Sequence, residues 1–167
     1  MIPTQRPIFK SSGAIRFANA LSAVETDRIA GLFGGGHRPG RRLSAMDVSQ
    51  IADLLGKDGP IGAVARNGMG PKVKPVRAIL LDKSPEANWR LGWHQDRTIA
   101  VERRVDVDGF GPWSSKAGQP HVQPPHEITA AMITLRVHVD DVDADNSPLE
   151  VLPGSHLMGR LSNEEVD

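Results

Sequence analysis

Residues 145–156 read Asp-Asn-Ser-Pro-Leu-Glu-Val-Leu-Pro-Gly-Ser-His, which predicts a turn and then a short apolar strand that ends at Pro153 and Gly154. The stretch just before it, residues 130–139, alternates between apolar and polar side chains. One face would carry Ile133, Leu135, Val137 and Val139, and the other Met132, Thr134, Arg136 and His138. Because strand side chains alternate with period two, both stretches indicate antiparallel β-structure in the C-terminal half.

More strands are predicted upstream of this pair. Residues 75–82 form an apolar run typical of a buried strand, residues 88–94 a second strand, and residues 98–101 the start of a third. Residues 109–125 are rich in glycine and proline and predict a long loop, a kind of segment that is functional or disordered in most compact domains. His121 and Gln123 in this loop are candidates to face a substrate, but surface positions are the simpler interpretation for both, as for His126.

The first third of the chain predicts helices. Ser22 and Glu25 have the spacing of a capping box, and Ser44 with Asp47 gives a weaker start signal. The apolar side chains that follow at helical spacing are Val24, Ile29, Leu32 and Phe33, and then Val48, Ile51, Leu54 and Leu55. The glycine-rich residues 35–42 predict a plain loop. Helices followed by short strands indicate an α+β fold with a sandwich or small barrel as its core.

The composition excludes several classes of protein. The 167 residues balance 20 Lys and Arg against 20 Asp and Glu, and they include no Cys and no Tyr. A net charge of zero argues against nucleic acid or an anionic membrane as a partner, because both attract basic surfaces. The lack of Cys excludes disulfides, thiolate-bound zinc, iron–sulfur clusters and thiol catalysis. The length suits one domain with a core of ordinary size.

The N-terminus shows no targeting signal. Residues 1–9 are polar and contain two prolines, so they lack the apolar centre of a signal peptide. The chain has no run of about 18 apolar residues that would span a membrane. We therefore expect a cytoplasmic protein with no membrane partner. The sequence leaves the oligomeric state open.

Trp93-His94-Gln95-Asp96 is the sharpest chemical feature of the chain. On an extended segment the imidazole of His94 and the carboxylate of Asp96 would point to the same side. Such a pair supplies two of the three ligands of a facial triad, which suits Fe(II) and leaves positions open for oxygen and substrate. A structural His–Asp hydrogen bond at a strand end is the simpler explanation of these residues alone. His138 and Asp140 have the same spacing, and chemistry alone does not separate the two pairs.

Three stretches taken together resemble the phytanoyl-CoA dioxygenase family. They are Trp93-His94-Gln95-Asp96, the predicted strand of residues 134–141, which ends in Asp, and residues 145–156, which end in Pro-Gly-Ser-His. The usual family pattern is W-H-x-D, a long loop, a strand ending in Asp, and then N-G-x-L-x-V-x-P-G-S-H. The resemblance covers residues 75–160. Ser147 departs from it, because the family usually has Gly at this position.

The resemblance implies a fold and an activity. The family has a double-stranded β-helix core, also called a jelly roll or cupin fold, with helices packed outside it. In this chain the helical part would span residues 20–66 and the β-helix part residues 75–160 of one partial domain, residues 1–167, incomplete at its C-terminus. The enzymes use Fe(II), 2-oxoglutarate and O2. The implied partner is a small-molecule substrate, an organic or acyl compound, which is usually hydroxylated on an aliphatic carbon.

The motif positions also imply site residues. By this resemblance His94 and Asp96 would bind the iron, whereas His138 and Asp140 would belong to a structural strand. Trp113 matches a Trp that lies against 2-oxoglutarate in related proteins. The position of Trp113 is equally compatible with an ordinary buried aromatic side chain.

Two further site residues of the family are expected to be missing. The second iron-binding His and the Arg that pairs with 2-oxoglutarate follow Pro-Gly-Ser-His by several tens of residues in the family, and such an Arg suits a carboxylate because its donors form a fork. We therefore predict feeble or no turnover for this chain. For this chain to be an active enzyme, His156 or His138 would have to supply the third iron ligand of a non-standard triad. The alternative to an enzyme is a non-catalytic remnant or binding protein that keeps part of the fold.

Overall fold

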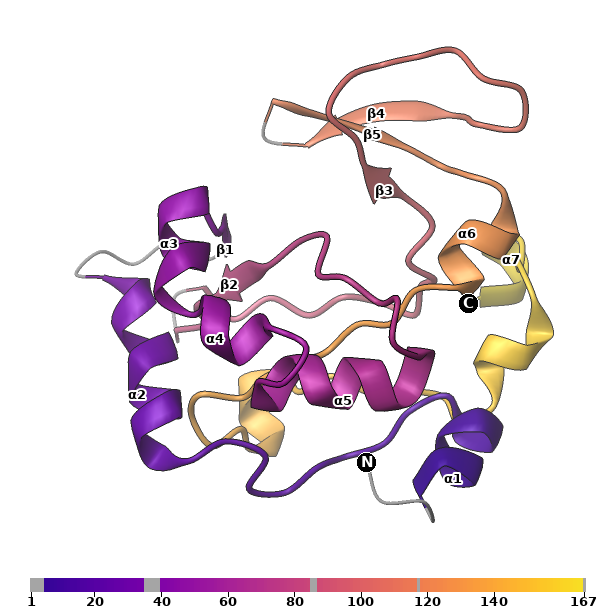
Figure 1. Cartoon of the computed structure of the whole chain (residues 1–167). Coiled ribbons are helices and arrows are strands. Elements are labelled where there is room, and N and C mark those ends of the chain that lie inside the picture. Colours follow the sequence, from indigo (N-terminus) through magenta and orange to yellow (C-terminus); the bar gives the residue numbers. More distant parts are fainter. Residues whose placement is uncertain (1–4, 35–39, 85–86, 117, 167) are drawn as a thin grey trace. The chain divides into compact units, whose positions relative to one another are not determined.

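A computed structural model of the chain describes residues 5–34, 40–84, 87–116 and 118–166 (Figure 1). Most of the loop predicted at residues 35–42 therefore lies outside the described residues. The chain divides into two compact units, each made of two separate stretches of sequence. Unit 1 consists of Met1–Arg90 and Thr134–Gly154, and unit 2 consists of Leu91–Ile133 and Ser155–Asp167.

Short helices make up most of the regular secondary structure of unit 1. They are α1 (Gln5–Ser12), α2 (Ala23–Ala30), the 3-10 turn η1 (Gly31–Phe33), α3 (Ala45–Gln50), α4 (Ala52–Leu55) and α5 (Pro60–Met69). Both predicted capping boxes are present, with Ser22 and Glu25 at α2 and with Ser44 and Asp47 at α3. The backbone N–H of Ser22 holds the pKa of Glu25 below its usual value. The second predicted helix is divided at Ile51, whose φ of −124° and ψ of 18° are not helical.

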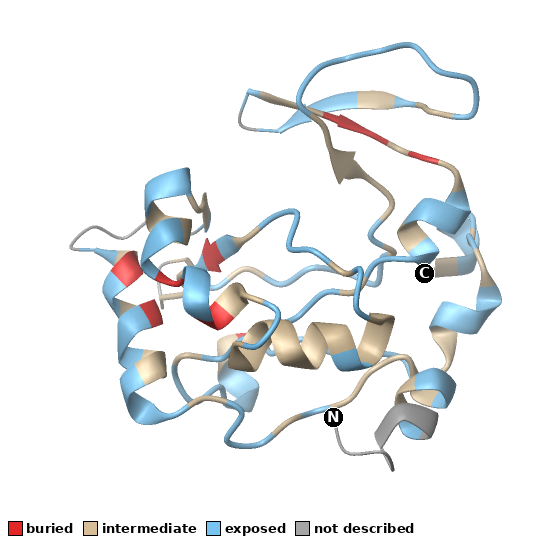
Figure 2. Ribbon diagram, viewed as in Figure 1, coloured by how far each residue is buried: buried red, intermediate tan, exposed pale blue. Residues whose placement is uncertain are grey.

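The core of unit 1 forms where these helices meet strand β2 (Ile79–Leu81). Its buried side chains are Ile29, Leu32, Ile51, Leu54 and Leu80 (Figure 2). Arg28 of α2 also donates two hydrogen bonds to Asp53 of α4, at 2.8 and 2.7 Å. This guanidinium lowers the pKa of Asp53 to about 2. An apolar cluster and an ion pair therefore both join α2 to α4.

Two glycines let α5 begin directly beside α4. A Cβ atom at Gly59 would lie 1.9 Å from the carbonyl oxygen of Asp53, and a Cβ atom at Gly62 would lie 1.9 Å from that of Gly56. Both positions have ordinary backbone angles, since Gly59 has a φ of −74° and Gly62 lies within α5. Lack of space, and not an unusual backbone conformation, therefore requires glycine at these positions.

Strand β1 (Gly40–Arg42) pairs with β2 in a two-stranded antiparallel sheet. Only Leu80 of β2 is buried, whereas Ile79 and Leu81 are 44% and 45% exposed. The strand predicted at residues 75–82 is thus shorter than expected and is buried on one face only.

The strands predicted at residues 130–139 and 149–152 are wrong, because the described residues contain no strand there. Leu135 and Val137 are 38% and 37% exposed, and Val139 is the member of this stretch that packs against the core. The strand predicted at residues 88–94 is likewise absent from the described chain. Alternation alone does not make a strand, because the backbone groups also need a neighbouring strand to pair with.

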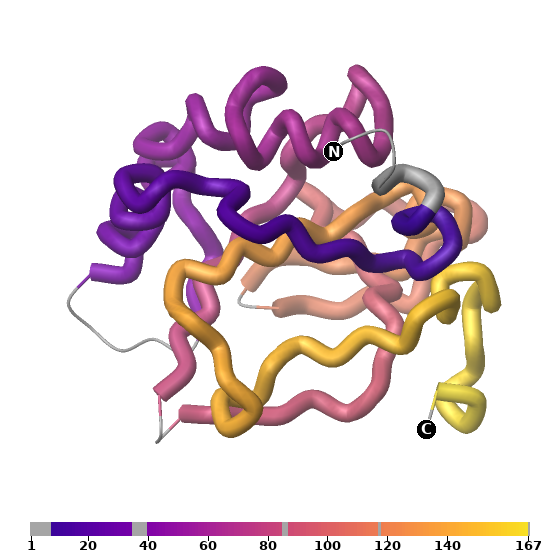
Figure 3. Tube along the Cα trace, turned by 90° about the horizontal axis from the view of Figure 1, so that it is seen from below, coloured from indigo at the N-terminus to yellow at the C-terminus, as the bar shows by residue number. Residues whose placement is uncertain are grey.

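Residues 134–154 bring a second stretch of chain into unit 1 (Figure 3). This stretch contains the 3-10 turn η3 (Ala144–Asn146). The carboxylate of Asp143 caps the turn by accepting from two backbone N–H groups, at 3.1 and 3.0 Å. The side-chain amide of Asn88 donates to the carbonyl of Asp145 at 2.7 Å, so the turn is also fastened to the first stretch of unit 1.

Unit 2 is built on a three-stranded antiparallel sheet with the order β3–β5–β4. Its strands are β3 (Ile99–Ala100), β4 (Trp113–Lys116) and β5 (Gln119–Val122), and its helical segments are α6 (His126–Ala130), the 3-10 turn η4 (Ser155–Met158) and α7 (Asn163–Val166). Strand β3 confirms the start of a strand predicted at residues 98–101. Strands β4 and β5 form a hairpin where the sequence predicts a loop. Gly118 between them has a φ of 77°, which glycine adopts at little cost.

Helices and small antiparallel sheets agree with the predicted α+β class. The described residues show no closed jelly roll, so the double-stranded β-helix stays an expectation from the resemblance. Within the described ranges, no helix has the length and apolar character needed to cross a membrane.

Candidate metal site

The Trp93-His94-Gln95-Asp96 stretch lies in unit 2, in the segment that leads into β3. His94 and Asp96 are both exposed. The Nδ1–H of His94 donates to the carbonyl oxygen of Gly92 at 2.8 Å. Because a carbonyl oxygen only accepts, this bond fixes the imidazole tautomer and leaves the lone pair of Nε2 available to a metal ion.

Two residues beside this pair, Gln95 and Arg97, contact another segment of unit 2. The amide of Gln95 binds two backbone groups within residues 159–161, and the guanidinium of Arg97 donates to a carbonyl in the same stretch. Gln95 and Arg97 therefore face residues 159–161, whereas His94 and Asp96 are exposed. The sequence motif alone gives Gln95 and Arg97 no role.

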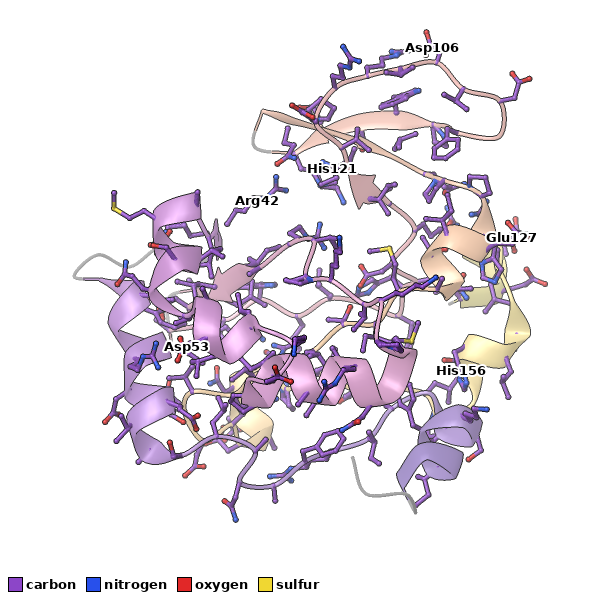
Figure 4. The ribbon with its side chains drawn as sticks, in the orientation of Figure 1. Arg42, Asp53, Asp106, His121, Glu127 and His156 are labelled. Atoms are coloured by element: carbon purple, nitrogen blue, oxygen red, sulfur yellow. The ribbon has the colours of Figure 1, made fainter. Side chains whose placement is uncertain are left out.

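The donor set suits Fe(II), since a neutral imidazole nitrogen and a carboxylate are two of the three ligands of a facial triad. His94 and Asp96 therefore fit two ligand positions. No third ligand joins them, because nowhere in the described part of the chain do three His, Cys, Asp or Glu side chains lie together so that they could hold a metal ion. His156, on η4 of the same unit, is exposed and lies well away from His121 (Figure 4). Because the described residues form no such group of three, the geometry offers no support for His156 as the third ligand.

The second pair with the same spacing, His138 and Asp140, lies in unit 1. Both residues are exposed, and they precede the turn η3 on a segment that forms no strand among the described residues. The described residues gather no third ligand around this pair either. Geometry gives no reason to prefer His138 and Asp140 as a metal site.

Trp113, the predicted 2-oxoglutarate contact, opens β4 and is half-buried. The guanidinium of Arg104 lies over its ring, 5.3 Å from the centroid, which is the geometry of a cation–π contact. Arg104 also donates to a carboxylate oxygen of Asp106 at 3.1 Å. Trp113 thus has a cationic neighbour within unit 2, and its contact with the cosubstrate stays a prediction.

The predicted surface position of His121 is wrong, because this residue is 0% exposed. It lies on the central strand β5, opposite Ala100 of β3 and Ser114 of β4. Its Nδ1–H donates to the carbonyl of Gln119 at 3.0 Å. Its place on the central strand gives His121 a neighbouring residue on each side. His126 on α6 is exposed, as predicted.

Ser147 departs from the family pattern, and its backbone has a conformation that suits glycine. Its φ of 41° and ψ of 64° are left-handed. The residue is 8% exposed, and its hydroxyl has no hydrogen-bond partner among the described residues. The Nζ of Lys83 donates to the carbonyl of Ser147 at 2.5 Å and lies 5.3 Å from the centroid of the Trp89 ring. Partial burial lowers the pKa of Lys83, and the positive charges of Arg136 and Arg90 lower it further.

Replacing Ser147 by glycine is expected to stabilise unit 1 by about 1 kcal/mol. The change relieves a left-handed conformation that costs an L-residue roughly 1–2 kcal/mol and removes an unpaired buried hydroxyl, while the more flexible unfolded chain offsets part of the gain. Urea denaturation followed by circular dichroism measures the difference. Ser147→Ala is the control, because it removes the hydroxyl and keeps the strain, so it should gain less. A glycine variant less stable than the wild type would contradict this explanation of the turn.

A comparison with known families brings these observations together. The family described as Phytanoyl-CoA dioxygenase (PhyH) matches residues 43–166, most of the chain. The matched region includes His94, Asp96 and the 145–156 stretch, so the resemblance inferred from these motifs is confirmed. No curated protein and no solved structure matched the chain. The chain belongs to the phytanoyl-CoA dioxygenase (PhyH) family.

Proposed function

We propose that this chain carries part of the active site of an Fe(II)- and 2-oxoglutarate-dependent dioxygenase, with His94 and Asp96 as two of the protein ligands of the metal. Membership of the family supports the dioxygenase class. The observation that carries the assignment is the hydrogen bond from the Nδ1–H of the exposed His94 to the carbonyl oxygen of Gly92, which in the neutral imidazole leaves the lone pair of Nε2 for a metal ion. Asp96, two residues further on, adds a carboxylate whose negative charge favours a divalent cation.

Each residue has a defined task in this proposal. Bound Fe(II), together with 2-oxoglutarate and O2, would supply the oxidising chemistry for hydroxylation of a small organic or acyl substrate. Gly92 holds the imidazole of His94 in one tautomer and one orientation, so that Nε2 is the nitrogen offered to the metal. Asp96 supplies an oxygen ligand and charge neutralisation. Trp113 would lie against the 2-oxoglutarate, as the resemblance implies.

Incubation of the 167-residue chain with Fe(II), ascorbate and 2-oxoglutarate tests this proposal. We expect the chain to bind the metal but to form succinate slowly or not at all, because its described residues supply two ligands and gather no third. Robust succinate formation by the same chain would contradict the two-ligand assignment. A chain that binds no divalent metal would contradict the oxygenase proposal and favour a non-catalytic binding protein.

A further inference from the structure

We propose that Gln95 and Arg97 are positioning residues, which clamp the metal-ligand segment of residues 93–97 to the segment of residues 159–163. The purpose of this clamp, to hold His94 and Asp96 in place for a metal, rests on the proposed function. The clamp itself rests on hydrogen bonds within unit 2.

The side-chain amide of Gln95 bridges two backbone groups. Its Nε2 donates to the carbonyl oxygen of Gly159 at 2.8 Å, and its Oε1 accepts from the N–H of Leu161 at 3.0 Å. A single amide group thus donates one hydrogen bond and accepts another, both with backbone groups of residues 159–161. A neighbouring β-strand would pair with these backbone groups in the same way. Gln95 is half-buried, whereas His94 and Asp96 on either side of it are exposed.

Arg97 fastens the same two segments at a second point. Its guanidinium donates to the carbonyl oxygen of Leu161 at 2.6 Å and to the side-chain oxygen of Asn163 at 3.4 Å. Leu161 is therefore held on both sides, because its N–H binds Gln95 and its carbonyl binds Arg97. Two anchors spaced two residues apart restrict rotation of the segment more than one anchor would.

The clamped segment is itself held in place. Arg160 donates to the carbonyl of Pro124, just beyond β5, at 2.8 Å. At the start of α7, the N–H of Ser162 donates to the carboxylate of Glu165 at 2.7 Å, and the N–H of Glu165 donates to the Ser162 hydroxyl at 3.3 Å. The N–H of Ser162 also keeps the pKa of Glu165 below its usual value. Residues 159–165 thus form a fixed support, and not a free tail, for the segment that they contact.

A fixed support matters because the two ligands lie in a segment without regular secondary structure. His94 and Asp96 flank Gln95, so their directions depend on the backbone angles that Gln95 and Arg97 hold. If that backbone were free to rotate, the metal would have to order it on binding, which weakens affinity. Partners that orient metal ligands typically contribute about 10–100-fold in affinity.

The test compares four variants of the full chain with the wild type. Gln95→Met keeps the length of the side chain and removes both of its hydrogen bonds. Arg97→Met removes the second anchor, and Arg97→Lys keeps a donor for the Leu161 carbonyl. Asn88→Ala is the matched control, because it removes an amide-to-backbone hydrogen bond of similar length, 2.7 Å, in unit 1. Isothermal titration calorimetry measures the affinity of each variant for Co(II). Amide hydrogen exchange measures how strongly the Leu161 N–H is protected.

Gln95→Met is expected to bind Co(II) about tenfold more weakly than the wild type and to lose the protection of the Leu161 N–H. Arg97→Lys should retain more affinity than Arg97→Met, and Asn88→Ala should change neither quantity. Unchanged exchange in Gln95→Met would overturn the clamp. Faster exchange with unchanged Co(II) affinity would overturn its positioning role. If the wild type binds no Co(II), the proposed function fails and the positioning role fails with it, whereas exchange at Leu161 still decides whether the clamp exists.

Discussion

Replacing His94 or Asp96 by alanine is expected to abolish the binding of a divalent metal, whereas the same change at His138 or Asp140 should leave it intact. Among the described residues, the proposed site has two protein ligands and gathers no third, so the loss of either would leave a single one. We expect an affinity loss of more than about 100-fold, beyond the range typical of residues that merely orient ligands. Titration with Co(II) under identical conditions measures all four variants.

The His138 and Asp140 variants are the matched controls for this prediction, because they alter the other His-x-Asp sequence of the chain. Circular dichroism of each variant establishes that the fold is retained. Retained affinity in His94→Ala, or a loss of affinity confined to the His138 and Asp140 variants, would show that the metal binds elsewhere than at the proposed site.

Replacing Gly62 by alanine is expected to destabilise unit 1 by about 3 kcal/mol. Helix propensity alone predicts the opposite, because alanine is favoured over glycine within a helix by about 1 kcal/mol. A Cβ atom at Gly62 would, however, lie 1.9 Å from the carbonyl oxygen of Gly56 and 2.5 Å from that of Leu55. Both are backbone atoms, so α5 would have to move away from α4, and overpacking of this kind typically costs about 1–3 kcal/mol or more.

Gly31→Ala provides the control for this steric argument. Gly31 has helical backbone angles, with a φ of −57° and a ψ of −23°, and a Cβ atom there would meet nothing within 4 Å. This change should therefore be neutral or stabilise the chain by about 0.5 kcal/mol through the unfolded state. Chemical denaturation followed by the helical circular dichroism signal compares the two variants. Equal stability of Gly62→Ala and Gly31→Ala would contradict the close approach of α4 and α5.

Local sequence signals predict the helices of unit 1 well. Ser22 with Glu25, and Ser44 with Asp47, form their hydrogen bonds within three residues, so the sequence contains both partners of each capping box. The apolar positions that follow supply most of the core, including Ile29 and Leu54.

Strands and side-chain partners at long range are predicted less well. Residues 130–139 alternate as a strand would, but the described chain places no strand beside them, and the last part of the apparent loop at 109–125 instead pairs as β5 with two neighbours. The partners of Gln95 lie 64 and 66 residues away, so no local pattern reveals its role. The three motifs together, and not His94 and Asp96 alone, give the family correctly, because short motifs in a fixed order require no knowledge of long-range packing.

The imidazole 15N spectrum of the chain tests the proposed metal site directly. The chain is labelled at its six histidines and titrated with Zn(II), which can bind the same two ligands and is not paramagnetic. In the free chain, we predict that the proton of His94 is on Nδ1, as the bond to Gly92 requires. On addition of Zn(II), the Nε2 resonance of His94 should shift as that of a metal-bound nitrogen. A proton on Nε2 in the free chain, or an unchanged His94 while another histidine responds, would contradict the assignment of the site.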